Sequence, residues 1–155
     1  MAVVDLLDLP AVLPPHAPLV GLDLGEKTIG VAVSDATRTV ASPLALIRKT
    51  RFTADAEALF ELMAGRGAAG IVIGLPVSMD GSEGPRCQSS RAFARNLLRL
   101  KDIPIAFWDE RMSSMAVNRM LIGEADMNRA RRAEVVDKAA AGWILQGALD
   151  RLRNG

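Results

Sequence analysis

Residues 21–35 read Gly-Leu-Asp-Leu-Gly-Glu-Lys-Thr-Ile-Gly-Val-Ala-Val-Ser-Asp, and this stretch decides the predicted fold. The flanking runs 19–24 and 29–33 are apolar and rich in branched side chains, and the short segment 25–27 between them is typical of a turn. The stretch therefore predicts a β-hairpin. One carboxylate, Asp23, interrupts the first of its two strands.

Asp23 has glycines beside it on the same face of the predicted strand. Side chains alternate between the two faces of a strand, so Gly21, Asp23 and Gly25 share one face. The missing side chains are expected to leave space for an ion or a phosphate to approach the backbone. A buried carboxylate needs a partner, which favours a bound cation or metal. The alternative is an ordinary strand-end aspartate that accepts hydrogen bonds from the following turn.

Length and composition indicate one compact domain. The chain has 155 residues, of which 50% are hydrophobic, and this is enough for one core. The net charge is only +1, so bulk charge gives no argument for nucleic-acid binding. The single cysteine, Cys87, excludes an internal disulfide and a multi-cysteine zinc site. We find no signal peptide and no apolar run long enough to cross a membrane, and therefore expect a cytoplasmic protein.

Residues 1–18 are predicted to form a Pro-rich N-terminal extension, and residues 19–155 a single domain. Residues 3–9 have room for one or two helical turns. The prolines at 10, 14, 15 and 18 then disfavour regular structure before the first strand.

The rest of the chain alternates between predicted helices and strands. The predicted elements are a third strand at 41–48, a helix from Thr53 to the glycines at 65 and 67, a strand at 71–73, a helix at 86–101, a strand at 103–108, a helix that Ser113 or Ser114 caps and Gly123 ends, and a last helix at 131–153. A Gly/Pro/Ser-rich loop occupies residues 74–85. Three antiparallel strands followed by alternating helices and strands predict an α/β fold, with a mixed sheet flanked by helices.

Two further carboxylates are candidates for the same site as Asp23. Glu110 follows a predicted strand directly, and ligands bind at the carboxyl ends of strands in open α/β sheets. Asp137 lies at the head of an apolar helical stripe that continues to Ala148 and must face the sheet. We therefore expect the three acids to converge. The alternatives are that Glu110 is a solvated charge paired with Arg111, and that Asp137 is an acid near the helix N-terminus that the helix dipole favours.

Basic residues supply the argument for a substrate. Residues 85–101 contain five basic residues and no acid, namely Arg86, Arg91, Arg95, Arg99 and Lys101. The second, third and fourth of these recur at every fourth position and form a stripe that predicts sequence-independent phosphate binding. The alternative is an ordinary solvated face. Lys27, Arg111 and Lys138 neighbour the three acids in sequence and are predicted to contact phosphates.

Aromatic residues are scarce, with four Phe, two Trp and no Tyr. This composition argues against a base-stacking platform of the kind used by single-strand-binding proteins. Recognition of backbone and shape is therefore the expectation.

Four motifs in the chain resemble one known family. They are the hairpin, the Gly74-Leu75-Pro76 loop with residues 79–85, residues 108–111 (Trp-Asp-Glu-Arg), and residues 136–140 (Val-Asp-Lys-Ala-Ala) with 144–146 (Ile-Leu-Gln). In this order they cover residues 19–153 and are similar to those of the YqgF family. Its members are proposed pre-16S rRNA nucleases, also called Holliday-junction-resolvase-like proteins, with a ribonuclease-H-like fold. The resemblance implies that Asp23, Glu110 and Asp137 match the family's three metal-binding acids.

The residues suit this chemistry independently of the resemblance. Two divalent ions about 3.5–4 Å apart can activate a water and stabilise a leaving oxygen during phosphodiester hydrolysis. Carboxylates without a His or Cys cluster favour Mg²⁺ or Mn²⁺ over zinc. Our hypothesis is that Asp23 bridges two ions while Glu110 and Asp137 each complete one side.

The expected function is therefore a metal-dependent nuclease acting on structured nucleic acid. The resemblance favours 5′-end processing of pre-16S rRNA in ribosome biogenesis, with structured RNA as the preferred partner and possible association with pre-ribosomal particles. Alternatives are a Holliday-junction-resolvase-like nuclease acting on branched DNA, and a non-catalytic RNA-binding assembly factor. The hairpin at Asp23-Leu24-Gly25 also resembles the phosphate-binding hairpin of actin-like and sugar-kinase ATPases, but those close two such domains over the nucleotide. The sequence leaves the oligomeric state open.

Overall fold

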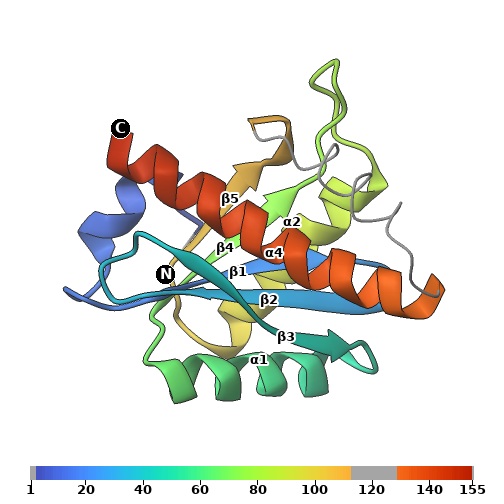
Figure 1. The fold of residues 1–155 in the computed structure, drawn as a ribbon, viewed down its shortest axis with the longest axis horizontal. Helices are drawn as coiled ribbons and strands as arrows, with labels where there is room; N and C mark the ends of the chain where they lie inside the picture. The colour runs from blue at the N-terminus through green and yellow to red at the C-terminus, as the bar shows by residue number, and fades with distance from the viewer. Residues whose placement is uncertain (1–2, 113–128, 155) are drawn as a thin grey trace.

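Five strands form one mixed sheet in the order β3-β2-β1-β4-β5 (Figure 1). The computed structural model describes residues 3–112 and 129–154, and the side chains of residues 129–138 lie outside this description. The strands are β1 (Leu19–Leu24), β2 (Thr28–Ser34), β3 (Ala41–Arg48), β4 (Gly70–Leu75) and β5 (Ile105–Asp109). The helical elements are η1 (Leu6–Val12), α1 (Phe52–Arg66), α2 (Pro85–Leu100), η2 (Glu110–Met112) and α4 (Arg129–Asn154).

The predicted hairpin and mixed sheet are confirmed. β1 pairs antiparallel with β2, and β2 pairs antiparallel with β3. On its other side β1 pairs in parallel with β4, which pairs in parallel with β5. The helix predicted to be capped at Ser113 or Ser114 lies outside the described residues.

Most predicted boundaries lie within two residues of the observed ones. β5 begins at Ile105 rather than at residue 103, because the intervening Pro104 has no N–H to donate to a neighbouring strand. The Pro104 carbonyl still accepts a hydrogen bond from the Ile71 N–H at 3.0 Å. α4 begins at Arg129, two residues before the predicted start.

Helices cover both faces of the sheet (Figure 1). On one face Ile144, Leu145 and Leu149 of α4 pack with residues such as Val72 and Trp108. On the other face residues of α1 and α2 pack with the alternate side chains of β1, β2 and β4. Within the described residues, no helix is long and apolar enough to cross a membrane.

Residues 3–18 pack against β5 and the end of α4 (Figure 1). The Val4 N–H donates to the Ile105 carbonyl at 2.9 Å, so the segment pairs with the edge strand. Leu9 and Leu13 are buried in the α4 side of the core. η1 includes Pro10, whose fixed φ is compatible with a 3₁₀ helix. This segment covers an edge that would otherwise expose backbone donors and acceptors. The domain boundary at residue 18 stays a prediction.

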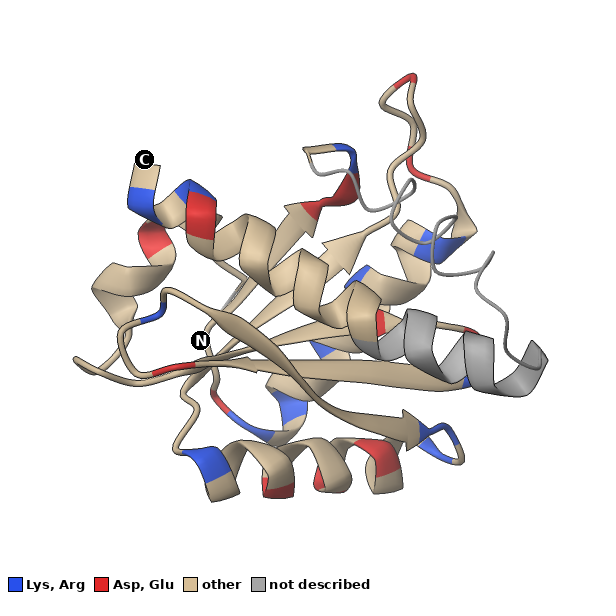
Figure 2. Ribbon diagram, viewed as in Figure 1, with Lys and Arg blue, Asp and Glu red and all other residues tan. Residues whose placement is uncertain are grey.

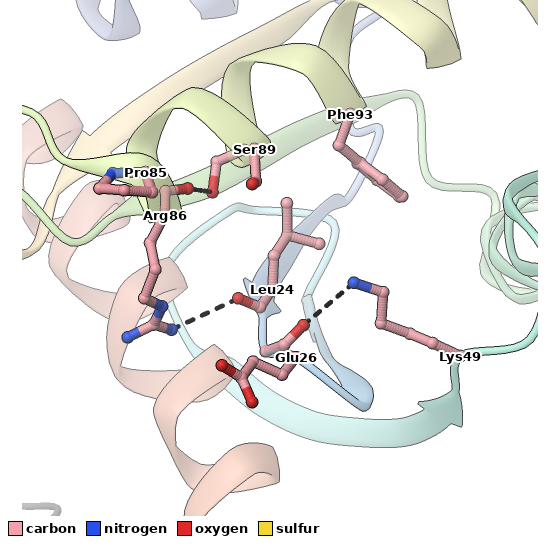
Figure 3. A pocket seen from close by; sticks show the side chains of 9 residues that line it. Leu24, Glu26, Lys49, Pro85, Arg86, Ser89 and Phe93 are labelled. Carbon is pink, nitrogen blue, oxygen red and sulfur yellow. Dashed lines mark hydrogen bonds between the residues drawn. The ribbon is translucent and has the colours of Figure 1, made fainter.

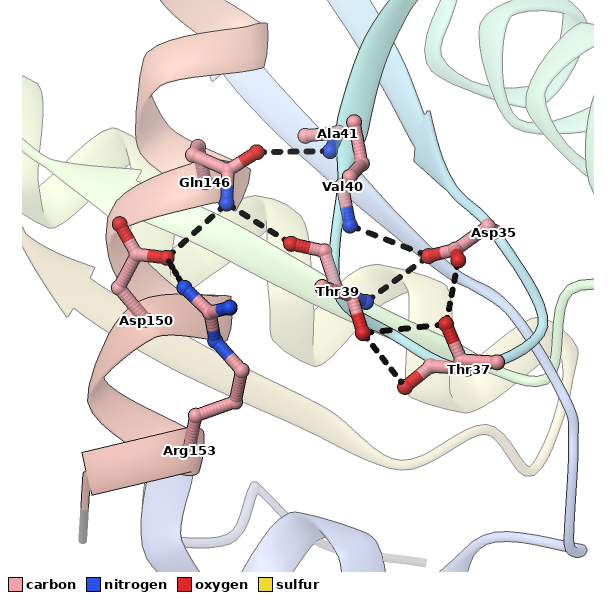
Figure 4. A network of polar contacts seen from close by, with 8 residues as sticks. All are labelled: Asp35, Thr37, Thr39, Val40, Ala41, Gln146, Asp150 and Arg153. Carbon is pink, nitrogen blue, oxygen red and sulfur yellow. Dashed lines mark hydrogen bonds and ion pairs between the residues drawn. The ribbon is translucent and has the colours of Figure 1, made fainter.

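Hydrogen bonds fix the loop between β2 and β3 and connect it to α4 (Figure 4). The Asp35 carboxylate accepts hydrogen bonds from the Thr37 hydroxyl and the Thr39 N–H. These bonds, with that of Thr37 contributing most, lower the pKa of Asp35 to about 2. Gln146 of α4 donates to the Thr39 carbonyl at 2.9 Å and accepts from the Ala41 N–H at 2.8 Å. The loop therefore holds α4 against the start of β3.

The space beside Gly21 is occupied by α4, which corrects the expectation of an ion or phosphate there. A Cβ atom at position 21 would lie 2.6 Å from the Cβ of Leu145 and 3.1 Å from the carbonyl oxygen of Ala141. These atoms belong to the helix backbone or lie directly on it, so no side-chain rotation relieves the overlap. The absence of a side chain at Gly21 therefore allows α4 to pack closely on β1.

We expect Gly21→Ala to lower the free energy of unfolding by about 1–3 kcal/mol, the usual cost of overpacking. Gly65→Ala is the matched control, because nothing lies within 4 Å of a Cβ at this α1 position. The control is expected to raise the free energy of unfolding by about 0.5–1 kcal/mol. Urea denaturation measures both, and wild-type stability of Gly21→Ala would show that α4 does not pack as closely as described.

Candidate metal and nucleic-acid site

Three parallel strands, β1, β4 and β5, end at the same edge of the sheet, where ligands bind in open α/β folds. Asp23 is the penultimate residue of β1, and Glu110 directly follows β5. The carboxylate of Asp23 is almost entirely buried, with 5% of the residue exposed. The fold therefore brings two of the three predicted acids to one edge.

Gly74 belongs to β4, the strand between β1 and β5, whose ends carry these two acids. The parallel register pairs Leu22 with Ile73, and one residue further along Asp23 is level with Gly74. A Cβ atom at position 74 would lie 3.3 Å from Oε1 of Glu110. The Glu110 carboxylate thus extends over β4, and adjacent strands are only about 4.8 Å apart. The same Cβ atom would lie 2.5 Å from Cδ1 of Ile144, so α4 also packs closely on this position.

The third predicted acid, Asp137, lies on α4, but its side chain is outside the described part of the structure. The later members of its stripe, Ala141, Ile144 and Ala148, are fully buried against the sheet. The prediction that this helix face packs on the sheet is therefore confirmed for the described members. Asp137 lies four residues before Ala141, a spacing that puts both on the same face of an α-helix. Convergence of all three acids stays a prediction.

The described residues fit a hard divalent cation. Carboxylate oxygens are the ligands that Mg²⁺ and Mn²⁺ prefer, and Asp23 and Glu110 supply them at one edge of the sheet. Among the side chains that the structure describes, no group of three or more His, Cys, Asp or Glu residues could hold a metal ion. A third protein ligand would have to come from outside that set, where Asp137 lies.

Arg111, a predicted phosphate ligand, is already paired. Its guanidinium donates to both carboxylate oxygens of Asp109, at 2.7 Å for the shortest contact. The pair lowers the pKa of Asp109 and raises the pKa of Arg111, in each case chiefly through these side-chain hydrogen bonds. Sequence reasoning missed Asp109 as this partner. Its position two residues before Arg111 was the available signal.

Arg91 of the predicted basic stripe is also paired. Its guanidinium makes two 2.7 Å hydrogen bonds to Glu83, in the loop before α2, and lies 5.0 Å from the ring centre of Phe107. The hydrogen bond from Arg91 lowers the pKa of Glu83. Both partners are partly exposed, so solvent screens the pair and we expect it to contribute little to stability. It connects the loop after β4 to α2.

The other predicted cations lie on the surface. Arg95 and Arg99 are exposed on α2, where Arg99 donates to the side chain of Asn96 at 3.4 Å. Lys27 is exposed in the β1–β2 turn, and the Lys138 side chain is not among the described ones. Acidic positions gather on α1 and basic ones on α2, which contains no acid (Figure 2). Whether these residues bind a substrate stays a prediction.

Arg86 differs from the stripe because it lies on the other side of α2. At 100° per residue, Arg86 projects about 180° from Arg95. It donates to the Leu24 carbonyl at 3.4 Å, next to Asp23. Lys49, which sequence reasoning missed, donates to the Gly25 carbonyl at 3.1 Å. The signal was the antiparallel pairing that brings the end of β3 beside the hairpin turn.

Comparison with known proteins identifies the family. Residues 17–151 match the model of the RuvX family, described as Holliday junction resolvase. A protein of Phenylobacterium zucineum named "Putative pre-16S rRNA nuclease" is 82% identical over 155 residues, with 99% of each chain covered. A protein of the same name from Caulobacter vibrioides is 70% identical over 154 residues, also with 99% of each chain covered.

The solved structure of Thermus thermophilus RuvC bound to a Holliday junction substrate shares the fold. The TM-score is 0.52 at 9% sequence identity, with 88% of this chain and 96% of that chain covered. The fold is thus that of the ribonuclease-H-like resolvases, with acids at the carboxyl edge of its parallel strands. By its sequence the chain belongs to the RuvX family, which is also called YqgF.

Proposed function

We propose that this chain is a metal-dependent nuclease that hydrolyses phosphodiester bonds in structured nucleic acid. The observation that carries the proposal is the pair Asp23 and Glu110, which the ends of β1 and β5 place at the carboxyl edge of the sheet, on either side of β4. Membership of the RuvX family supports the same class of reaction. It also argues against the kinase-like interpretation of the hairpin.

In this proposal Asp23, Glu110 and Asp137 would hold Mg²⁺ or Mn²⁺. Bound ions of this kind activate water and stabilise the leaving oxygen in phosphodiester hydrolysis. Burial of Asp23 lowers the local dielectric and strengthens its interaction with a cation. The exposed basic residues Lys27 and Arg86 neutralise phosphates beside the cleaved bond, and those of α2 guide the substrate to this edge.

The proposed role is 5′-end processing of pre-16S rRNA in the cytoplasm, in association with pre-ribosomal particles. Support comes from the relatives named "Putative pre-16S rRNA nuclease", which share up to 82% identity with this chain. A second candidate is cleavage of branched DNA, and the description of the family model favours it. Both candidates use the same carboxylates and differ in the nucleic acid bound.

The test incubates the purified chain with an end-labelled RNA carrying a structured 16S precursor leader, and separately with a four-way DNA junction. Each reaction contains Mg²⁺, Mn²⁺ or a chelator. We expect cleavage of the RNA with either ion and none with the chelator. Cleavage of the junction alone would favour the second candidate. Binding without cleavage in every condition would contradict the nuclease proposal and favour an assembly factor.

A further inference from the structure

A cavity of about 270 Å³ lies beside the hairpin turn, on the face of the sheet opposite to α4 (Figure 3). Leu24 and Gly25 of the turn form its floor, and Lys49 together with the first turns of α2 forms its walls. Asp23 immediately precedes this floor on the opposite face of β1, so the cavity and the candidate metal site lie on the two faces of the sheet at the same edge. Typical pockets for drug-sized ligands measure about 300–1,000 Å³, so this cavity suits one small unit.

Two cations approach the cavity from opposite sides (Figure 3). Arg86 donates one hydrogen bond to the Leu24 carbonyl, and Lys49 donates one to the Gly25 carbonyl. Within the described residues neither forms an ion pair, in contrast to Arg91 and Arg111. Most of their donors thus remain available to an anion, and both side chains are exposed enough to reach one.

The rest of the lining fits more than a bare phosphate. Phe93 and Leu24 present apolar surface, and the Ser89 side chain supplies a hydroxyl. The Phe93 ring is held edge-to-face against Phe52, with 5.4 Å between the ring centres. A ring fixed in this way can pack against a base at little entropic cost, and such contacts are tolerant of sequence. Glu26 at the rim is an acceptor for a sugar hydroxyl.

We propose that this cavity binds one nucleotide of the substrate strand, next to the cleaved bond. Arg86 and Lys49 bind its phosphate, and its base packs against Phe93. The inference deepens the proposed nuclease function and rests on it for the identity of the strand. It differs from the sequence-based expectation of pure backbone recognition, because Phe93 lines the cavity together with the two cations.

The first experiment follows backbone amide NMR signals during titration with AMP, ribose 5-phosphate, adenosine and inorganic phosphate, all in chelator. We expect saturable shifts at Gly25, Lys49 and Ser89, with AMP binding more tightly than the other three. No localised shift with AMP, or equally tight binding of inorganic phosphate, would overturn the proposal. Because no metal is present, this result does not depend on cleavage.

Variants assign the contacts. Lys49→Met and Arg86→Gln should each weaken AMP binding about tenfold, since each removes a charged hydrogen bond. Phe93→Leu should weaken AMP binding but not ribose 5-phosphate binding. Arg66→Gln is the matched control. Arg66 is the last residue of α1, about 21 Å from Phe52 at the other end of the helix, and Phe52 is the residue that contacts Phe93 of the cavity. Wild-type affinity in both charge variants would contradict the assignment.

A kinetic measurement separates substrate binding from binding of a free nucleotide. In cleavage of the structured RNA, Lys49→Met should raise KM about tenfold and leave kcat unchanged, as expected when uniform binding is lost. AMP should compete with the RNA. An unchanged KM, or AMP bound without competition, would overturn the substrate role. If AMP binds but no nucleic acid is cleaved, the nuclease proposal fails while the cavity retains its ligand class.

Discussion

Asp23→Asn should reduce metal-dependent cleavage at least about 100-fold. Metal ions contribute several kcal/mol of charge stabilisation to the transition state, and each 1.36 kcal/mol corresponds to a factor of ten in rate. The amide has the shape of the carboxylate but lacks the charge that would hold two cations. The measurement is a single-turnover cleavage rate in Mg²⁺ and in Mn²⁺, with circular dichroism to verify that the variant is folded.

Glu61→Gln is the control for this substitution. Glu61 is an exposed acid on α1, which packs on the face of the sheet opposite to α4, and its loss changes the net charge equally. We expect its cleavage rate to equal that of the wild-type chain. Full metal-dependent cleavage by Asp23→Asn would show that Asp23 holds no catalytic ion.

Gly74→Ala should lower the affinity for Mn²⁺ and the cleavage rate at least about tenfold, the lower end of the effects seen when the surroundings of metal ligands change. The added methyl group would lie 3.3 Å from Oε1 of Glu110, a contact tight enough to shift that carboxylate. Isothermal titration calorimetry with Mn²⁺ measures the affinity, and the cleavage assay measures the rate.

The same methyl group also overlaps Ile144, at 2.5 Å from Cδ1, so a loss of stability must be separated from a loss of metal. Ile144→Val removes that carbon atom. The double variant Gly74→Ala/Ile144→Val should regain part of the stability lost in Gly74→Ala but none of the Mn²⁺ affinity. Recovery of affinity together with stability would mean that Gly74 matters only for packing. Gly65→Ala controls for an added methyl group elsewhere.

The order of elements and the mixed sheet could be predicted because local signals agreed with the final topology. Apolar strands separated by a Gly-containing turn predicted β1 and β2, and the wholly apolar run at 71–73 predicted a strand covered on both faces. The role of Gly21 could not be predicted. A glycine beside a carboxylate indicates open space, and only the path of α4 shows what fills it.

The electrostatic state of the site also depended on contacts that the sequence does not show. The arginines at 91 and 111 were expected to face phosphates, but each has a carboxylate partner within hydrogen-bonding distance. Lys49 lies 26 residues after Asp23 in sequence and reaches the same turn through the β2–β3 pairing. The sequence shows which residues on a helix are cationic, but the fold decides which of these cations remain available to a ligand.

The most direct test of the candidate metal site is a crystal structure of this chain with Mn²⁺, examined by anomalous diffraction. We expect Mn²⁺ at the carboxyl edge of the sheet, with Asp23 and Glu110 as ligands and Asp137 completing the site. The anomalous peak of this Mn²⁺ ion should be absent from crystals of the Asp23→Asn variant. An absence of Mn²⁺ at this edge, in crystals of a chain that cleaves nucleic acid with Mn²⁺, would contradict the assignment of the three acids.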